Sequence, residues 1–294
     1  MKELIVGLVQ QNCTANRNEN IGKSIDGIRE AASRNAQLVV LQELHLGPYF
    51  CQTEDPARFD LAEPIPGPAT KAFGSLASEL NLVIVASIFE RRAVGLYHNT
   101  AVVLEKDGSL AGIYRKMHIP DDPGYYEKYY FTQGDLGFNP ISSSIGKLGI
   151  LVCWDQWYPE AARLMALCGA EILVYPTAIG WEPTASDTER GLMLDAWVTI
   201  QRSHAIANAL PLVCANRVGF EPAGNTQDTG LIFWGNSFIT GPQGEFLSKA
   251  GHDREEVLTA RVDLSKTEVV RRNWPFFRDR RIDAYGGLLK RFRD

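Results

Sequence analysis

Cys153 lies where the sequence changes from a buried strand to a polar, aromatic turn and then to a helix. The apolar run 148–152 predicts the strand, and Pro159 suits the first turn of a helix over 160–168, because its missing N–H would have no partner there. The positive potential of a helix end and a neighbouring cation favour the thiolate form of a cysteine. Cys153 is therefore a candidate nucleophile; the alternative is a small buried residue that ends a core strand.

Two charged residues, Glu43 and Lys116, also lie at the ends of apolar segments. Segment 38–44 is typical of a strand buried on both faces, and a charge at its end is costly unless it faces a site. Lys116 follows a predicted β-hairpin over 100–114, which turns at an Asp-Gly pair. A solvated strand end is the simpler interpretation of each residue alone. Together with Cys153 they supply a base, a cation and a nucleophile, which acyl transfer by a thiol requires.

A rival arrangement pairs the cysteine with a histidine. His118 lies close to Lys116 in the sequence, and His204 lies in a predicted helix over 191–209. A cysteine beside a histidine is also an activated nucleophile. The residues alone leave this pairing open.

The composition limits the class of protein. The chain has 294 residues, 45% of them hydrophobic, and a net charge of −5, which argues against nucleic acid and anionic membranes as partners. No apolar run reaches the roughly 18–20 residues that span a bilayer, and the N-terminus lacks the regions of a signal peptide. Five cysteines without a C-x-x-C pair argue for the reducing cytoplasm and against a disulfide scaffold. We find no nucleotide-binding or zinc motif and expect neither a cofactor nor a metal.

Strand and helix signals alternate along the chain, but hairpins are mixed among them. We expect strands at 4–9, 38–44, 82–89, 100–104, 109–114, 148–152, 171–176, 211–216, 236–240, 245–248 and 257–262, and helices at 18–34, 69–80, 160–168, 191–209 and 266–272. No linker, repeat or low-complexity segment divides the chain, so we expect one domain over 1–294. The mixture of hairpins and alternation favours two sheets with helices outside them over one doubly wound sheet.

Two further segments have unusual compositions. Loop 121–139 gathers four tyrosines between Pro and Gly residues, which is typical of a binding loop. The tail 271–294 carries eight Lys or Arg residues beside Trp274, Phe276 and Phe277. An apolar and basic tail could bind RNA, but we favour packing against its own or a neighbouring subunit.

Three segments, at 41–44, 114–118 and 153–160, resemble the motif blocks of the nitrilase superfamily, the carbon–nitrogen hydrolases. They read Leu-Gln-Glu-Leu, Tyr-Arg-Lys-Met-His and Cys-Trp-Asp-Gln-Trp-Tyr-Pro-Glu. Their order fits the family, and the similarity covers essentially the whole chain. The resemblance implies an α/β fold, a four-layer αββα sandwich. It also implies a homo-oligomer, a dimer or larger, in which tail 271–294 packs on a neighbouring subunit.

The resemblance assigns roles to individual residues. It implies Glu43 as general base, Lys116 as the stabiliser of the tetrahedral intermediate and Cys153 as nucleophile. Glu127 matches a second glutamate of the family, which braces the lysine and can orient the substrate. The backbone N–H of Trp154 is expected to help the lysine ammonium hold the oxyanion.

Further segments look most like the N-carbamoylputrescine amidases of polyamine synthesis. They lie at 119–128, 153–162, 175–180 and 274–281. This likeness implies a ureido-amine substrate that is hydrolysed to putrescine, carbon dioxide and ammonia.

Other functions compete with this one. A β-ureidopropionase or N-carbamoyl amino acid amidohydrolase binds a carboxylate and needs an Arg or Lys clamp. A cationic amine needs acids and aromatic faces, which the chain offers in Asp121, Asp122, Tyr125 and Glu182. We therefore favour a small-molecule ureido-amine over a ureido-acid. A catalytically inactive sensor or scaffold is a third hypothesis, against which the intact set of catalytic residue types argues.

Overall fold

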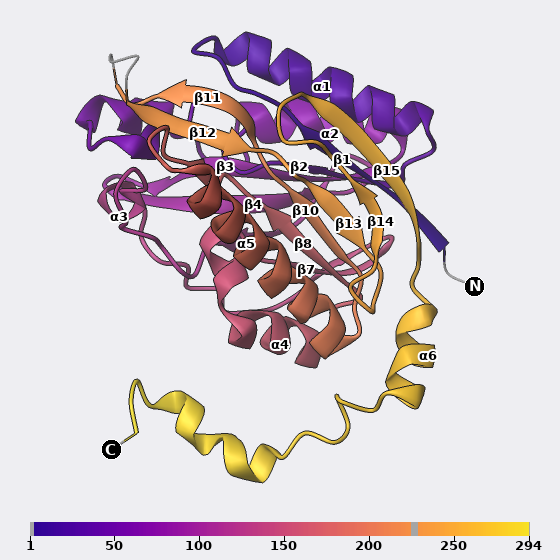
Figure 1. Cartoon of the computed structure of the whole chain (residues 1–294). Helices are drawn as coiled ribbons and strands as arrows, with labels where there is room; N and C mark the ends of the chain where they lie inside the picture. Colours follow the sequence, from indigo (N-terminus) through magenta and orange to yellow (C-terminus); the bar gives the residue numbers. More distant parts are fainter. Residues whose placement is uncertain (1–2, 225–228, 294) are drawn as a thin grey trace.

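Two six-stranded sheets face each other in the computed structural model, which describes residues 3–224 and 229–293 (Figure 1). The first sheet has the order β15-β1-β2-β3-β4-β5. Its strands are β1 (Glu3–Gln10), β2 (Leu38–Leu41), β3 (Val83–Ala93), β4 (Leu96–Leu104), β5 (Leu110–Arg115) and β15 (Glu256–Asp263). Strands β1, β2 and β3 are parallel, whereas β4 pairs antiparallel with both β3 and β5. Strand β5 therefore runs in the same direction as β2.

The second sheet has the order β14-β13-β10-β8-β7-β6, and β7, β8 and β10 are parallel. Its strands are β6 (Ile141–Ser143), β7 (Gly146–Ile150), β8 (Ile172–Pro176), β10 (Leu212–Ala215), β13 (Phe238–Thr240) and β14 (Phe246–Lys249). A small third sheet contains β9 (Gly180–Trp181), β11 (Val218–Pro222) and β12 (Gly230–Trp234).

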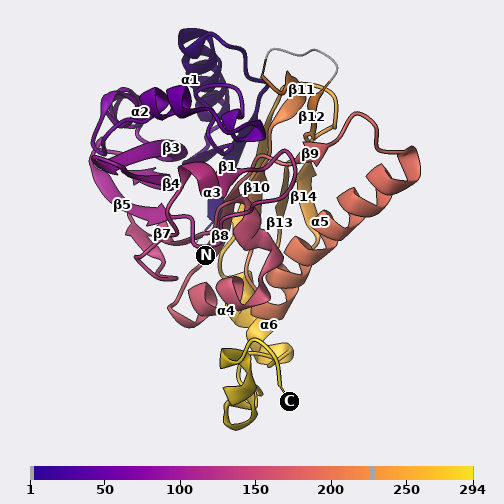
Figure 2. The ribbon, with the colours of Figure 1, turned by 90° about the vertical axis from the view of Figure 1, so that its left-hand side faces the viewer.

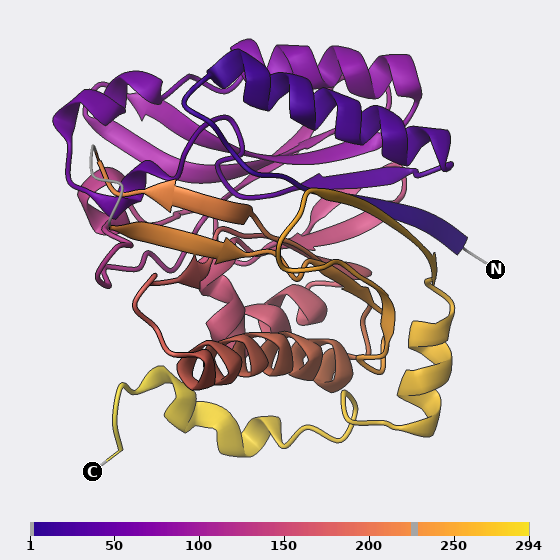
Figure 3. The same cartoon turned by 45° about the horizontal axis from the view of Figure 1, so that its top comes forward.

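Helices form the two outer layers, as Figures 2 and 3 show. Helices α1 (Arg17–Ser33) and α2 (Pro68–Leu80) pack on the outer face of the first sheet. Helices α4 (Pro159–Leu167) and α5 (Asp187–Asn208) cover the second sheet. The predicted αββα sandwich is therefore confirmed.

Local sequence signals explain where these helices begin. The Asn16 side chain accepts the backbone N–H groups of Asn18 and Glu19 at the start of α1. Ser186 and Glu189 form a reciprocal capping box at the start of α5. Pro159 occupies the first turn of α4, as the sequence predicted.

The strand ends bring the candidate residues together. Glu43 follows β2, Lys116 follows β5 directly, and both strands run toward the same edge of the first sheet. Cys153 follows β7, whose carboxyl end lies in the facing sheet. The Glu43 N–H donates to the Thr177 carbonyl, beyond β8, at 3.2 Å, so the two sheets are joined at this edge. The carboxyl ends of parallel strands are where α/β folds place their sites.

Several predicted boundaries differ from the structure. Strand β2 ends at Leu41, so Glu43 lies in the turn beyond it, where its side chain can leave the sheet. The region 178–187, predicted as a polar loop, contains the short strand β9. Strands β11 and β12 were not predicted. Gly, Glu and Pro obscure the alternation of a strand in β11, whereas β12 is a short apolar run.

The C-terminal tail leaves the two sheets after α6 (Lys266–Asn273), below the layer of α4 and α5 (Figure 1). Phe277 is the point at which it packs on the core, and the guanidinium groups of Arg163 and Arg271 lie over its ring. Beyond it the 3₁₀ helix η4 (Ile282–Leu289) exposes large apolar side chains, including Leu289 at 94% exposure.

Candidate active site

A buried cluster of charges forms around the ammonium of Lys116. Its Nζ lies 2.9 Å from Oε1 of Glu43 and 2.7 Å from Oε2 of Glu127. All three side chains are fully buried. Burial alone would lower the pKa of Lys116, but the facing carboxylates of Glu127 and Glu43 raise it well above its ordinary value. The lysine is therefore a fixed positive charge.

Arg217 holds the turn that carries Glu43. Its guanidinium donates to the carbonyl oxygens of Glu43, Leu44 and Gly47 at 3.0, 2.8 and 2.9 Å. Leu44 has a φ of 48°, a left-handed conformation that is rare for a residue other than glycine. Arg217 is itself fully buried and paired with Glu221 at 2.6 Å. The buried pair thus stabilises a strained turn next to the carboxylate.

Asn99, in β4, contacts both charged partners. Its side-chain Nδ2 donates to Oε1 of Glu43 at 2.6 Å, and its carbonyl accepts the backbone N–H of Lys116 at 2.9 Å. The Oε2 atom of Glu43 is buried and has no hydrogen-bond partner within the described residues. One oxygen of this carboxylate is thus occupied and the other is free.

Glu127 enters from the short helix α3 (Glu127–Tyr130), within the predicted binding loop. Its Oε1 accepts a hydrogen bond from the Tyr49 hydroxyl at 2.6 Å. Burial raises the pKa of Glu127 to about 7, with Lys116 opposing the rise and Glu43 adding to it. Glu127 braces the lysine through one oxygen and is itself held through the other.

Cys153 begins the 3₁₀ helix η3 (Cys153–Trp157) and is 5% exposed. Its φ is 46°, so the cysteine is also in the left-handed region, and its Sγ lies 3.6 Å from the Ala178 carbonyl. Burial and the Glu43 carboxylate raise the pKa of the thiol well above its ordinary value, although Lys116 acts in the opposite direction. The neighbouring cation thus acts in the direction that the sequence analysis expected, but burial outweighs it, and α4 begins only at Pro159. A base must remove the thiol proton.

Asp155 connects the turn at the cysteine to the strand that carries Lys116. Its Oδ2 accepts the backbone N–H of Val152 and the Tyr114 hydroxyl, at 2.9 and 2.8 Å. Its Oδ1 accepts the backbone N–H of His118 at 3.0 Å and lies 2.7 Å from the His118 ring. Tyr114 and His118 flank Lys116 in the sequence, so this fully buried carboxylate fixes the cation relative to the nucleophile.

The family model for carbon-nitrogen hydrolases matches residues 5–272. The chain belongs to the carbon–nitrogen hydrolase family. It is thus a hydrolase of C–N bonds, and the predicted resemblance to the nitrilase superfamily is confirmed.

Individual relatives resemble this hydrolase over nearly their whole lengths. It is 44% identical to the N-carbamoylputrescine amidase of Solanum lycopersicum, over 97% of this chain and 94% of that protein. It is 39% identical to a citrullinase of Francisella tularensis, over 99% of this chain and 100% of that protein. The crystal structure of a carbon-nitrogen hydrolase from Helicobacter pylori G27 is 55% identical and superposes with a TM-score of 0.95, over 99% and 100% of the two chains.

The two histidines of the alternative Cys–His pairing contact other residues of this hydrolase. His118 stacks on Tyr158, with ring centroids 3.8 Å apart, and is bonded to Asp155. His204 lies in α5 beside the Tyr175 hydroxyl, and burial lowers its pKa to about 4. Within the described residues, the hydrogen bond of the Cys153 thiol goes to Ala178 and not to a histidine.

Of the residues predicted to bind substrate, two lie near Cys153 or its contact Ala178, and three are exposed acids. Trp154 directly follows Cys153 in η3 and is half-buried. The hydroxyl of Tyr125 bonds with both the N–H and the carbonyl of Gly180, at 3.0 and 3.1 Å, two residues beyond Ala178. Asp121, Asp122 and Glu182 are exposed.

Most aromatic side chains of the predicted binding loop have a packing role. Tyr130 and Phe131 are buried against Phe50 and Phe89 in a cluster of aromatic rings. The cluster anchors α3 and with it Glu127.

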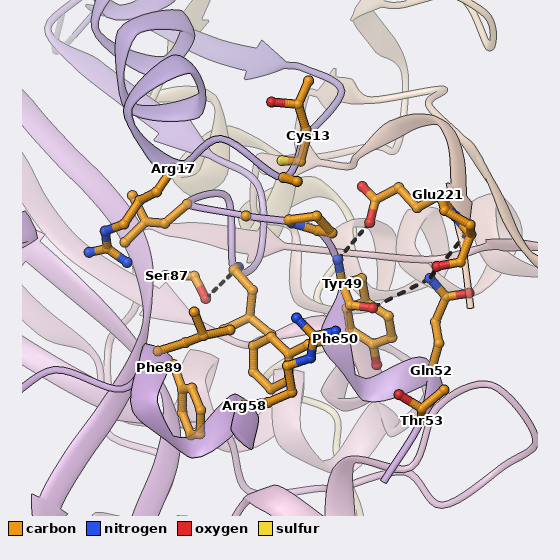
Figure 4. Close-up of a pocket in the computed structure, with 18 of the residues that line it drawn as sticks. Cys13, Arg17, Tyr49, Phe50, Gln52, Thr53, Arg58, Ser87, Phe89 and Glu221 are labelled. Atoms are coloured by element: carbon orange, nitrogen blue, oxygen red, sulfur yellow. Dashed lines mark hydrogen bonds between the residues drawn. The ribbon is translucent and has the colours of Figure 1, made fainter. Parts of the chain in front are cut away.

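A cavity of about 430 Å³ lies beside the catalytic cluster (Figure 4). Its lining includes Tyr49, Ser87 and Glu221, and Glu221 accepts the Tyr49 backbone N–H at 2.6 Å. Lys116 and Cys153 are not among the described residues that line it. The cavity thus borders the side chains that position the catalytic groups.

Sequence reasoning missed Tyr49, Asn99, Asp155 and Arg217. Asp155 lies inside the motif that contains Cys153, so its position two residues after the nucleophile was an available signal. Tyr49 lies five positions after the 41–44 segment, Asn99 and Arg217 lie outside the three segments, and none of these three residues carries a pattern of its own.

No group of three or more His, Cys, Asp or Glu side chains in the described part of the chain is arranged to hold a metal ion. Among the same residues, no helix is both long and apolar enough to cross a membrane.

Proposed function

We propose that the chain is a thiol amidohydrolase that cleaves the carbamoyl C–N bond of N-carbamoylputrescine and releases putrescine, carbon dioxide and ammonia. The observation that carries the proposal is the buried Lys116 ammonium between two carboxylates, which interacts electrostatically with Cys153, a cysteine with a positive φ. Sequence identities of 43–44% to plant N-carbamoylputrescine amidases support this substrate.

In the first half of the reaction, Glu43 takes the proton of the Cys153 thiol as sulfur attacks the ureido carbon. The resulting oxyanion is stabilised by the Lys116 ammonium and the Trp154 backbone N–H. Collapse of the tetrahedral intermediate, with return of a proton to the leaving nitrogen, expels ammonia. The sulfur then carries the carbamoyl group with its amine chain.

In the second half, Glu43 removes a proton from water as the water attacks the same carbon. Breakdown regenerates the thiol and releases a carbamic acid, which decomposes to the amine and carbon dioxide. Glu127 takes no proton in this scheme; it holds Lys116 in place throughout.

The far end of the substrate is proposed to be an ammonium held by one or more of Asp121, Asp122 and Glu182, beside Tyr125. An exposed ion pair contributes about 0.2–1 kcal/mol, whereas a desolvated pair contributes more. Neutralising the correct acid, as in Glu182→Gln, should raise KM for N-carbamoylputrescine and leave the hydrolysis of uncharged butylurea unchanged. Equal effects on both ureas would contradict this recognition scheme.

A substrate panel tests the reaction. Ammonia release is measured from N-carbamoylputrescine, N-carbamoyl-β-alanine, butylurea and citrulline, with Cys153→Ala as the control. The proposal predicts the highest kcat/KM for N-carbamoylputrescine and no release by the variant. Preference for the ureido-acid would indicate a β-ureidopropionase or N-carbamoyl amino acid amidohydrolase and would overturn the substrate assignment.

Citrulline hydrolysis is a second candidate, because the chain is 39% identical to a citrullinase over that protein's full length. Citrulline carries a carboxylate beside its distal ammonium. Its recognition therefore needs a cationic side chain, which the recognition of N-carbamoylputrescine does not. A higher kcat/KM for citrulline than for N-carbamoylputrescine would favour this function.

We also propose a single-domain protein of the cytoplasm that assembles as a homo-oligomer and binds neither nucleic acid nor membrane. Exposed apolar side chains support the assembly. They lie on α4 and α5, at Leu164, Leu167, Leu192, Met193 and Ile206, and on the tail, at Ile282, Leu288, Leu289 and Phe292. In the proposed oligomer, tail 271–294 packs on the neighbouring subunit.

A further inference from the structure

We infer that Asn99 is a positioning residue that selects Oε2 of Glu43 as the oxygen that removes the thiol proton. The inference rests on the proposed role of Glu43 as general base and deepens it. Asn99 contributes no atom to the reacting groups; it acts through the carboxylate.

The two oxygens of Glu43 lie in different surroundings. Oε1 accepts hydrogen bonds from Nδ2 of Asn99 at 2.6 Å and from Nζ of Lys116 at 2.9 Å. Oε2 is buried and unpartnered within the described residues. An oxygen that accepts two hydrogen bonds, one of them from a cation, is less basic than its neighbour. The proton from Cys153 therefore goes to Oε2: the S–H bond breaks, an O–H bond forms, and the sulfur keeps the electron pair with which it attacks the carbonyl carbon.

The amide of Asn99 is held in one orientation by a chain of hydrogen bonds. The backbone N–H of Leu44 donates to the Ser87 hydroxyl oxygen at 3.1 Å, and that hydroxyl donates to Oδ1 of Asn99 at 3.2 Å. With Oδ1 accepting, Nδ2 must donate, and it faces Glu43. This series of hydrogen bonds begins at Leu44 and ends at its neighbour Glu43, so the Asn99 amide and the Glu43 turn hold each other in place.

The backbone of Asn99 has a separate function. Its carbonyl accepts the N–H of Lys116, and this bond does not depend on the side chain. A substitution at Asn99 thus removes the side-chain contact to the base and leaves the backbone bond to the cation. Several charged or titratable groups interact electrostatically with Glu43. Among the described residues they include Lys116, Glu127, Cys153, Arg217, Tyr49, Cys51 and Tyr125.

The test compares Asn99→Ala and Asn99→Asp with the wild type. Asp has nearly the shape of Asn, but an ionised Asp cannot donate a hydrogen bond to Glu43. Its negative charge also repels the Glu43 carboxylate. We expect kcat to fall roughly 10- to 100-fold, the loss of one hydrogen bond to a charged group, while KM changes less than threefold. Asn99→Asp should be at least as slow as Asn99→Ala.

Asn208→Ala is the matched control. Asn208 is also a buried asparagine, and its amide donates to the His204 carbonyl in α5, away from the catalytic cluster. Both Ala variants delete a buried amide, so both should lower the melting temperature, but Asn208→Ala should keep the wild-type kcat.

A second readout does not depend on the substrate. The rate at which iodoacetamide alkylates Cys153, followed by peptide mass spectrometry, should fall with kcat in the Asn99 variants and stay at the wild-type value in Asn208→Ala. If the wild type hydrolyses no ureido compound, the proposed substrate fails while the alkylation rates still decide the role of Asn99.

Unchanged kcat and alkylation in folded Asn99→Ala would overturn the inference, and so would a rise in KM with kcat held. Should both Asn99 variants fail to fold, Ser87→Ala takes their place. It leaves Asn99 intact but releases its amide, and a kcat loss of about 3- to 10-fold would support the inference. Wild-type kcat in Ser87→Ala would then overturn it.

Discussion

The side chain of Lys116 is the residue on which the proposed chemistry depends most. A buried ammonium is tolerated only when opposite charges and hydrogen bonds compensate its desolvation. Glu43 and Glu127 provide this compensation here, so the positive charge is present before an oxyanion forms. Such a charge stabilises the transition state without reorganisation.

Lys116→Met tests this role. Because the oxyanion exists mainly in the transition state, kcat should fall by about 10²–10³-fold or more, with a much smaller change in KM. Steady-state kinetics of ammonia release measure both, and a melting curve checks that the two unpaired carboxylates have not unfolded the protein. A raised KM with unchanged kcat would make the lysine a binding residue.

The raised pKa of Glu127 leads us to predict that the stability of the fold depends on pH. Its pKa rises from 4.5 to about 7 in the folded protein, so the folded state keeps a proton that the unfolded state releases between these values. Its contribution to stability is therefore largest below about pH 4.5 and declines as the pH rises toward 7. Urea unfolding at several pH values should show a smaller decline in Glu127→Gln than in the wild type. An identical pH dependence would contradict the raised pKa.

For single residues, the sequence predicted the catalytic candidates that lie within a motif. Glu43, Lys116 and Cys153 end apolar segments, and the structure places Glu43 and Lys116 in direct contact. Tyr49 and Asn99 could not be predicted, because each contacts its partner across more than fifty positions of chain, a distance that local periodicity does not reach.

Among the elements, the turns after the strands carry the site. Leu44 and Cys153 both adopt positive φ values, at the ends of strands from different sheets. Strained turns of this kind persist only where the surrounding structure over-determines them. The sequence predicted the strands, but not that β2 ends at Leu41 or that Arg217 holds the following turn, since a buried arginine has no pattern in the sequence.

Arg217→Met tests the importance of that turn. The substitution leaves Glu221 buried without its cation and frees the carbonyls of the Glu43 turn, which should cost about 3–5 kcal/mol of unfolding free energy. Arg261→Met is the matched control, because Arg261 pairs with Glu3 at the surface and should cost less than about 1 kcal/mol. Urea denaturation compares the two. Equal losses of unfolding free energy in the two variants would mean that the buried Arg217–Glu221 pair stabilises the fold no more than a surface pair does.

For the whole molecule, the αββα sandwich explains why residues far apart in the chain converge. Strands β2 and β5 end at one edge of the first sheet, and β7 ends in the sheet that faces it. The alternation of strands, helices and hairpins was sufficient to predict two sheets with outer helices. The small sheet of β9, β11 and β12 was not predicted, because β9 is only two residues long and pairs with the distant strand β12.

Removal of residues 274–294 tests the proposed role of the tail. The segment beyond Phe277 exposes several large apolar side chains, which are costly in water unless another surface covers them. We expect the truncated protein to have a lower molar mass than the full chain in light scattering at equal concentration. A wild-type mass would show that the tail does not contribute to assembly.

The proposed covalent mechanism is tested most directly by acid quench and peptide mapping. Wild-type protein is mixed with N-carbamoylputrescine labelled in its amine chain and quenched during turnover. The mechanism predicts label on the peptide that contains Cys153, as a carbamoyl group that retains the amine chain, and no label or ammonia release in Cys153→Ala. Label on another residue, or turnover by Cys153→Ala, would contradict it.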